Sequence, residues 1–283
     1  MNYFIYNPIA GNSPSKKRAA LVRLIKLDPT NIILETENKS EETKLALKAI
    51  ELGAKKVIAI GGDGTINKVA LALAGTKIPL GIIPIGSGNG LARHLGIPMN
   101  PKIALYKALK GKINQIDACQ IGDKMFFCTA GIGFDAAVAQ IFNKRGKRGL
   151  FNYIVSLFIA LRTYEPIEIE IEPGKKEKIF LLTFANANQY GNNAFISPFA
   201  DIQDGKFEII KIKNNSLFSL LPLSLRLFLK TLHKSKGVEI ISARDISIKY
   251  KINQPLQIDG ESLETREEVL NVSIRKDALT VIV

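Results

Sequence analysis

The chain has 283 residues, 46% of them hydrophobic and 23% charged, which is the composition of a folded protein with a sizeable core. Its formal net charge of +13 favours anionic partners: nucleotides, nucleic acids or anionic membrane surfaces. We expect no nucleic acid partner, because the sequence lacks tryptophan and any recognition-helix or RNA-binding motif.

The opening segment, the apolar stretches and the few cysteines of the sequence predict a cytoplasmic protein. The opening MNYFIYNP lacks a basic segment followed by a long apolar one, so we expect no signal peptide. The longest apolar region, Leu217–Leu229, is interrupted by Pro222 and Arg226 and is too short to span a bilayer. Cys119 and Cys128 lie in stretches that predict neighbouring buried strands, and we expect both to be reduced thiols.

The first half of the chain alternates short apolar runs with helical patterns. Strands are predicted at 3–6, 32–34, 57–60 and 80–84, and helices at 15–26, 41–52 and 66–73. The first helix should bury Leu21, Leu24 and Ile25. Ser40 is a candidate N-cap for the second, with Glu41 and Glu42 favoured by the helix dipole. This order predicts a Rossmann-like parallel α/β domain with right-handed crossovers.

Beyond about residue 114 the pattern changes to short β-like runs. Strands are predicted at 115–121, 124–129, 167–171, 179–185, 207–212, 238–241, 245–250, 255–258, 269–274 and 279–283, with helices at 149–162 and 217–233. Strands at this spacing predict a β-sandwich. We place the boundary near Gly111, which gives a nucleotide-binding α/β domain over 1–111 and a β-sandwich lipid-substrate domain over 112–283. The last strand is a candidate to return to the first domain.

A glycine-rich motif, GGDGT at 61–65, lies between a predicted buried strand and a helix. Glycines there let the main chain come close to a ligand, and the helix N-terminus directs N–H groups into the same space. A phosphate site is one interpretation, and an ordinary turn between strand and helix is the other. The sequence has no Walker A motif, so we expect no P-loop lysine.

Two further loops follow strands of the same predicted sheet. GSGNG at 86–90 follows the strand ending at Pro84, and the segment 7–12 follows the first strand. Since the carboxyl ends of parallel strands meet at one edge, we expect all three loops to border one crevice, where open α/β sheets bind their ligands.

Together these segments resemble the diacylglycerol kinase catalytic-domain family, which includes bacterial lipid kinases and is related to sphingosine and ceramide kinases. The resemblance covers nearly the whole chain. It is carried by NPIAG at 7–11, GGDGTIN at 61–67, GSGNGLARHLGIP at 86–98 and DGE at 259–261. GGDGT alone is shared with NAD kinases, and a close variant with phosphofructokinases; the second motif separates the sequence from both.

The resemblance implies an ATP site on the first domain. Ser87 stands where many relatives have threonine and keeps a hydroxyl there. Gly90 and His94 vary among relatives and are given no role. The residues that the resemblance assigns to ATP are Asn7, Pro8, Gly11, Thr36, Gly61, Gly62, Asp63, Gly64, Thr65, Ile66, Asn67, Ser87, Gly88 and Asn89.

Three acidic residues are the catalytic candidates. On sequence alone Asp259–Gly260–Glu261 is a hairpin turn, because Asp-Gly is a favoured tight-turn pair. The resemblance instead makes Glu261 the general base that accepts the proton of the lipid hydroxyl, with Asp259 beside it. Asp63 is expected either to organise its loop or to help hold a magnesium ion that bridges the phosphates.

A second acidic turn, DIQDGKF at 201–207, is either a solvated turn or a metal site. It resembles the family segment that holds a structural Mg²⁺. Asp204 matches the family's aspartate, and Asp201 and Lys206 are expected to contribute main-chain oxygens. ATP and Mg²⁺ are therefore the expected cofactors.

Two regions are candidates for membrane contact. One is the basic cluster Lys144, Arg145, Lys147 and Arg148, with the apolar 150–153 after it. The other, 217–233, has the pattern of a basic amphipathic helix, which lies either on an anionic bilayer or on the sheet. The expected partner is a lipid substrate at an anionic membrane surface, with peripheral membrane association. The oligomeric state stays open, a homodimer included.

The function expected from these features is ATP-dependent transfer of the γ-phosphate to a hydroxyl of a diacylglycerol-like or sphingoid lipid. An NAD-kinase-type kinase of a soluble metabolite is the alternative, but it leaves the basic amphipathic stretches unexplained. A non-catalytic nucleotide- or lipid-binding module is the second alternative. It is disfavoured because Asp63, Glu261 and the glycines are all present.

Overall fold

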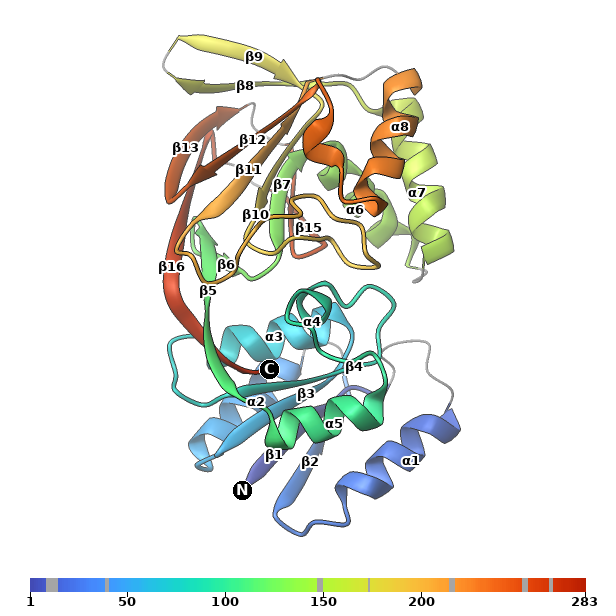
Figure 1. Cartoon of the computed structure of the whole chain (residues 1–283), viewed down its shortest axis with the longest axis vertical. Helices are drawn as coiled ribbons and strands as arrows, with labels where there is room; N and C mark the ends of the chain where they lie inside the picture. Colours follow the sequence, from blue (N-terminus) through green and yellow to red (C-terminus); the bar gives the residue numbers. More distant parts are fainter. Residues whose placement is uncertain are drawn as a thin grey trace. The chain divides into compact units, whose positions relative to one another are not determined.

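The computed structural model describes residues 1–8, 15–38, 41–146, 150–172, 174–213, 217–250, 254–264 and 267–283. The chain forms two compact units (Figure 1). Unit 1 comprises Met1–Ile116 and Lys276–Val283, and unit 2 comprises Asp117–Arg275. The chain passes between them within two strands, β5 (Ile113–Ile121) and β16 (Val269–Ile282).

Unit 1 is built on a parallel sheet in the order β2-β1-β3-β4, with the end of β16 pairing parallel to β4 through Val281 and Leu80. Every residue of β4 is buried, as a continuous apolar run predicts for a strand covered on both faces. The strands are β1 (Asn2–Tyr6), β2 (Asn31–Glu35), β3 (Lys56–Gly61) and β4 (Leu80–Pro84). The helices are α1 (Ser15–Ile25), α2 (Glu42–Glu51), α3 (Asp63–Leu73), α4 (Gly90–His94) and α5 (Pro101–Lys110).

The strands and helices predicted for residues 3–84 are confirmed. One detail of the first helix is wrong, because Leu24 is exposed while Leu21 and Ile25 are buried. Helix α5 was not predicted, although its start carries a capping signal: the side chain of Asn100 accepts the Lys102 amide, and Pro101 occupies the first turn. The proposed cap Ser40 lies outside the described residues.

Unit 2 contains two sheets, as expected for a β-sandwich. A six-stranded antiparallel sheet has the order β12-β11-β10-β7-β14-β15. Within this unit the second sheet comprises the first part of β16, β13, β8 and β9, with β5 and β6 attached. The strand bounds are β6 (Lys124–Phe126), β7 (Thr129–Gly133), β8 (Ile167–Glu172), β9 (Lys175–Ile179), β10 (Leu181–Ala185), β11 (Phe207–Ile212), β12 (Val238–Ala243), β13 (Asp245–Tyr250), β14 (Pro255–Ile258) and β15 (Glu261–Glu264).

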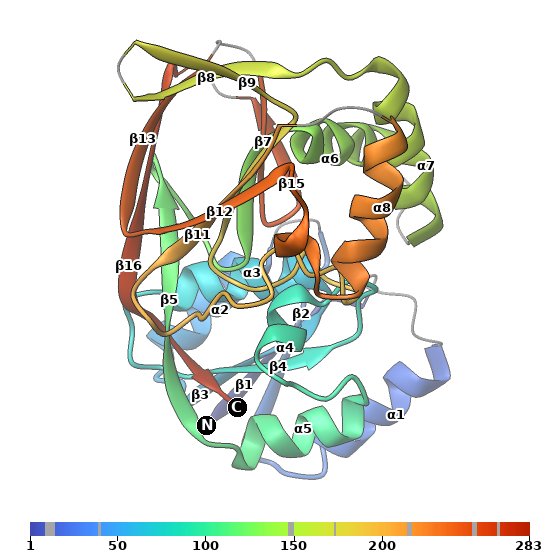
Figure 2. The ribbon, with the colours of Figure 1, turned by 45° about the horizontal axis from the view of Figure 1, so that its top comes forward.

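The alternation of side chains along β10 separates two cores in unit 2. Leu182 and Phe184 belong to the core between the sheets, whereas Leu181 and Ala185 belong to a second core on the other face. Helices α6 (Phe134–Arg145), α7 (Leu150–Thr163) and α8 (Leu217–Phe228), followed by the 3-10 turn η1 (Leu232–Lys234), cover that second core (Figure 2).

Several predictions for unit 2 need correction. The runs at 269–274 and 279–283 form the single strand β16, which continues through the polar residues Arg275–Asp277 although they break the apolar pattern and Asp277 has a positive φ of 51°. The predicted strand 124–129 ends at Phe126, and α6, β7, β9 and β15 were not predicted as separate elements. Cys119 is buried in β5, whereas Cys128 lies in the turn after β6, and both are thiols.

Asp135 of α6 is a buried carboxylate on the helix-facing side of the six-stranded sheet. Its Oδ2 accepts hydrogen bonds from the Thr183 hydroxyl at 2.9 Å and the Gln257 amide at 3.3 Å, and its Oδ1 accepts the Ala136 amide at 2.8 Å. Burial nevertheless raises the pKa of Asp135 to about 7, because desolvation penalises the charged form more than these donors favour it.

This pKa predicts a pH dependence of stability. In the unfolded chain an aspartate has a pKa of about 3.9. The folded state therefore holds the proton to higher pH, and stability falls as pH rises from about 4 to about 7. Between pH 5 and pH 8 the free energy of unfolding of the wild type should fall by about 2–3 kcal/mol relative to that of Asp135→Asn, whose side chain cannot ionise. Urea unfolding at both pH values measures this difference, and parallel pH profiles for the two proteins would contradict it.

Candidate active site

The two glycine-rich loops of unit 1 touch through their main chains. Gly61 ends β3 and the segment 86–90 follows β4, the neighbouring parallel strand, so both loops start at the same edge of the sheet. A Cβ on Gly86 would lie 2.5 Å from the Cα of Gly62, and one on Gly62 would lie 3.2 Å from the Cα of Gly86. Only residues without a side chain allow this approach.

Asp63 joins the start of α3 to the second glycine loop. Its Oδ2 accepts the amide of Asn89 at 2.7 Å, and its Oδ1 accepts the amide of Gly90 at 2.6 Å. Burial raises the pKa of Asp63, and this effect exceeds the opposing effects of the two amides and of the Arg93 charge. Both carboxylate oxygens are thus engaged in organising the loops, which is the first of the two roles predicted for Asp63.

The second loop is held in a bent conformation by its own side chains. Asn89 is buried in the left-handed region, with φ of 53°, and its Nδ2 donates to the carbonyl of Gly86 at 2.8 Å. Arg93 Nε donates to the carbonyl of Gly88 at 3.0 Å. Ser87, at the tip of the loop, is exposed. The loop therefore presents its hydroxyl and main chain to solvent on a fixed scaffold.

The start of α3 provides an electropositive pole beside these loops. Its first intrahelical hydrogen bond runs from the Ile66 amide to the Gly62 carbonyl at 3.0 Å. The amides of Gly64 and Thr65 come before this bond and have no acceptor within the helix. Together with the helix dipole they favour an anion such as phosphate.

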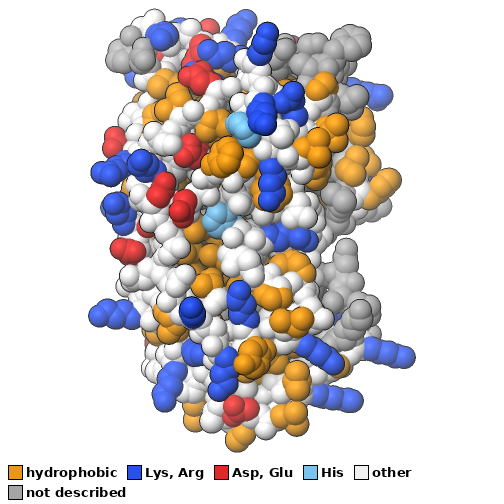
Figure 3. Space-filling view, in the orientation of Figure 1, with side chains coloured by type: hydrophobic (Ala, Val, Ile, Leu, Met, Phe, Trp, Pro, Cys, Tyr) orange, Lys and Arg blue, Asp and Glu red, His pale blue; other side chains and the backbone are white. Residues whose placement is uncertain are grey.

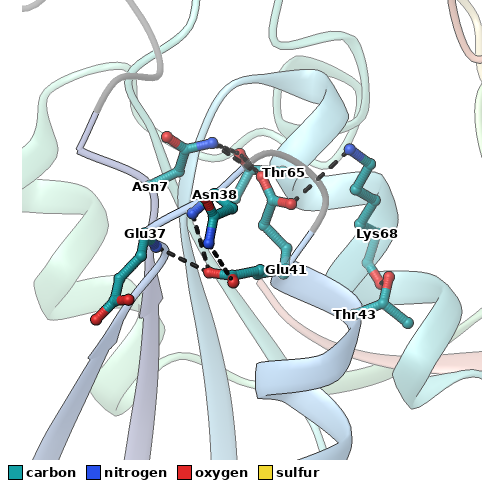
Figure 4. Close-up of polar contacts among 8 residues, drawn as sticks. Asn7, Glu37, Asn38, Glu41, Thr43, Thr65 and Lys68 are labelled. Atoms are coloured by element: carbon teal, nitrogen blue, oxygen red, sulfur yellow. Dashed lines mark hydrogen bonds and ion pairs between the residues drawn. The ribbon is translucent and has the colours of Figure 1, made fainter.

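Glu42 was missed as a site residue by the sequence analysis, which assigned it to the helix dipole alone. It is buried, and its Oε1 accepts the Asn7 side-chain amide at 2.8 Å and the Thr65 hydroxyl at 3.3 Å (Figure 4). Its Oε2 lies 3.8 Å from the ammonium of Lys68. Its partners are 23 to 35 residues away in the sequence, so only folding reveals that Glu42 links three elements at this edge.

The other residues assigned to ATP surround this edge. The amide of Thr36, a buried residue, donates to the carbonyl of Tyr6 at 3.0 Å, and the Pro8 carbonyl accepts Arg18 Nη1 at 2.8 Å. Ile66 is buried. Asn67 is half-buried on α3, and Gly11 lies outside the described residues. The structure thus brings the described segments after β1, β3 and β4 to one end of one sheet.

In unit 2, Asp259 and Gly260 form the tight turn between β14 and β15. Both have positive φ, 47° and 82°, as a two-residue hairpin loop requires. The Asp259 carboxylate also accepts three main-chain amides, those of residues 127, 128 and 129, at 2.8 to 3.0 Å. Asp259 therefore fixes the turn to the segment between β6 and β7. Glu261 is exposed at the start of β15, directly after this anchored turn.

The acidic turn at 201–206 is held to β5 by a buried aspartate that the sequence analysis missed. Asp117 Oδ2 accepts the Gly205 amide, and the Asp117 amide donates to the Ile202 carbonyl, both at 2.7 Å. Asp201 and Asp204 are exposed. In the described parts of the chain, no three His, Cys, Asp or Glu side chains gather to hold a metal. The predicted site depends mainly on main-chain oxygens, so it stays a prediction.

Comparisons with known proteins cover both units. Residues 2–121 match the family described as the diacylglycerol kinase catalytic domain, and residues 128–283 match the YegS C-terminal NAD kinase beta sandwich-like domain. The chain is 32% identical to a diacylglycerol kinase of Mycobacterium tuberculosis, over 83% of this chain and 78% of that protein. It is also 32% identical to a protein of Chromohalobacter salexigens named as a probable lipid kinase YegS-like, over 77% of this chain and 73% of that protein.

A solved structure shares the fold. It is a putative diacylglycerol kinase from Bacillus anthracis with a TM-score of 0.78 and 22% identity, covering 99% of this chain and 96% of that one.

The contact between the glycine loops predicts the effect of adding one methyl group. Gly86→Ala should push the loops apart, because its Cβ meets the Gly62 main chain. The bonds from the Asn89 and Gly90 amides to Asp63 should then weaken, and their hydrogen exchange should accelerate by about tenfold or more. Gly75→Ala is the control, since its Cβ meets nothing within 4 Å and it costs only backbone strain. Equal exchange at these amides in both variants would contradict the loop contact.

Proposed function

The chain belongs to the diacylglycerol kinase family of lipid kinases, which are phosphotransferases with an alcohol group as acceptor, and we propose that its phosphoryl donor is ATP. The proposed acceptor is the hydroxyl of a diacylglycerol-like or sphingoid lipid. The main observation in support of a nucleotide donor is the pair of glycine loops that Asp63 holds together beside the N-terminus of α3.

The residues at this edge fit a triphosphate. Side chains at Gly62, Gly86 or Gly88 would collide with the facing loop or with the Asp63 carboxylate, so their absence lets the two loops pack closely and hold their main-chain amides in a fixed arrangement that suits a bulky anion. The Glu42 bonds orient the Asn7 amide and the Thr65 hydroxyl in the same region. ATP supplies the γ-phosphoryl group, and these residues align it without forming a covalent bond to it.

We assign the proton acceptor to Glu261. As the acceptor oxygen of the lipid bonds to the γ-phosphorus, the bond to the β–γ bridging oxygen breaks and ADP leaves. The hydroxyl proton passes to the Glu261 carboxylate. Two observations support the assignment: the carboxylate is exposed, and the preceding turn is fixed by three hydrogen bonds to Asp259. In this proposal Asp259 is a positioning residue.

Glu261→Gln tests the assignment, because the amide keeps the shape of the side chain and cannot accept the proton. We expect kcat to fall by about 10²-fold or more with little change in the Kd for ATP. Glu264→Gln is the matched control, another exposed acid on the same strand, and should keep the wild-type rate. Transfer of ³²P from labelled ATP to a lipid extract measures the rate and identifies the product. A wild-type rate for Glu261→Gln would refute the role of this residue.

We also propose that the turn at 201–206 binds a structural Mg²⁺. Its donors are carboxylate and carbonyl oxygens, which Mg²⁺ prefers, and Asp117 anchors the turn from β5. Asp204 would supply a carboxylate oxygen, and Asp201 and Lys206 would supply main-chain oxygens.

Removing the metal should therefore lower stability. Chelation with EDTA should lower the Tm of the wild type by a few degrees, and added Mg²⁺ should restore it. Asp204→Asn should lose most of this response, whereas Asp245→Asn, an exposed control in the same unit, should keep it. Differential scanning fluorimetry with and without Mg²⁺ measures the effect. An equal response of all three proteins would show that the metal, if bound, lies elsewhere.

A further inference from the structure

Helix α7 exposes an apolar stripe on the side opposite to its core-facing side. Ser156 and Ala160 are fully buried toward the core of unit 2. Phe151, Ile154 and Phe158 follow the spacing of one helical face and are 75%, 42% and 62% exposed. A surface helix normally has polar residues on that side, so the stripe is not explained by packing within the described chain.

Helix α8 repeats this arrangement beside α7. Leu223 is buried in the core that α7 also covers, whereas Leu225, Phe228 and Leu229 are 54% to 60% exposed. Both views of the ribbon place α7 and α8 side by side (Figures 1 and 2). We call the six exposed residues Phe151, Ile154, Phe158, Leu225, Phe228 and Leu229 the α7–α8 face.

A further exposed aromatic residue adjoins the end of α8. The ring of Phe199 meets the ring of His233 edge-on at 5.0 Å, and its exposed fraction is 76%. The Phe195 amide donates to the Leu227 carbonyl at 2.9 Å, which fixes this loop against the helix. The apolar surface therefore extends past the helix on a rigid support.

The two segments that carry the α7–α8 face have charges of one sign only. Segments 150–163 and 217–237 contain no aspartate or glutamate. Their basic residues are Arg162, Arg226, Lys230, Lys234 and Lys236. In the space-filling view, orange and blue side chains lie together over α7 and α8 (Figure 3). Apolar residues flanked by cations suit a surface that is itself apolar beneath an anionic layer.

We propose that the α7–α8 face inserts into the interface of an anionic bilayer. No helix in the described part of the chain is long and apolar enough to cross a membrane, so contact is confined to the interface. A second copy of the chain fits less well, because a two-fold contact through this face would bring the basic residues of both copies together. The inference rests on the proposed function, since a lipid kinase must meet its substrate in a bilayer.

Vesicle binding tests the proposal without nucleotide or catalysis. The full chain is mixed with vesicles of phosphatidylcholine alone or with about 30% phosphatidylglycerol, and bound protein is separated by flotation. We expect binding to the anionic vesicles that weakens with salt. Phe158→Ser with Leu225→Ser should weaken it by about tenfold or more. Lys234→Gln with Lys236→Gln should weaken it and reduce its salt dependence.

The matched control is Leu27→Ser with Tyr106→Ser, which removes from unit 1 two hydrophobic side chains that are more exposed, at 78% and 70%, than Phe158 and Leu225. We expect this pair to bind as the wild type does, and unchanged thermal melting of each variant shows that it folds. Wild-type binding by the Phe158/Leu225 pair, or equal loss in the control pair, overturns the proposal. So does a wild-type dimer that the Phe158/Leu225 pair converts to a monomer, because the face then binds a second copy.

Activity on a dispersed short-chain lipid alcohol separates this proposal from the proposed function. The Phe158/Leu225 pair should keep the wild-type rate on that substrate and lose rate only on vesicles. If no lipid alcohol is phosphorylated by the wild type, the proposed function fails, while the vesicle result still decides whether the face binds membranes.

Discussion

Unit 1 depends on one close approach, that of the main chains at Gly62 and Gly86. The approach is possible because neither residue has a side chain, and it is locked because the Asp63 carboxylate accepts the main-chain amides of Asn89 and Gly90 at the end of the second loop. Burying this carboxylate is costly, as its raised pKa shows, so the two short hydrogen bonds are what retain it there. The result is a closely packed pair of loops next to the N-terminus of α3, the edge to which we assign the phosphates.

Unit 2 uses carboxylates in a different way. Asp259 accepts three main-chain amides and so fixes the turn that precedes Glu261, while Asp117 holds the acidic turn at 201–206 to β5. Each of these acids is engaged by backbone groups of a distant segment. They convert turns, which are mobile in isolation, into fixed supports for the exposed acidic residues next to them.

Most elements of the fold were predictable because their burial follows simple periodicities. The apolar strands predicted for unit 1 and most of the strands predicted for unit 2 were found within one or two residues of their bounds. Two of the failures share a physical cause. The small residues of β7, TAGIG, and the polar middle of β16 lack the side-chain pattern of a strand; β7 becomes a strand by pairing with β10, and the polar middle of β16 is carried between segments that pair with β13 and β4. The residues 9–14, which include Gly11, lie outside what the structure describes.

The sequence by itself determined the fold class, the family resemblance and the glycine positions of the two loops, because these follow from local periodicity and from residue types that permit special backbone geometry. Tertiary structure alone decided which acids are tied to which amides, that Glu42 links Asn7, Thr65 and Lys68, and that α7 and α8 turn apolar stripes outward. Such contacts join residues tens of positions apart, and a helix's periodicity shows that it has two faces without showing which one the core will cover.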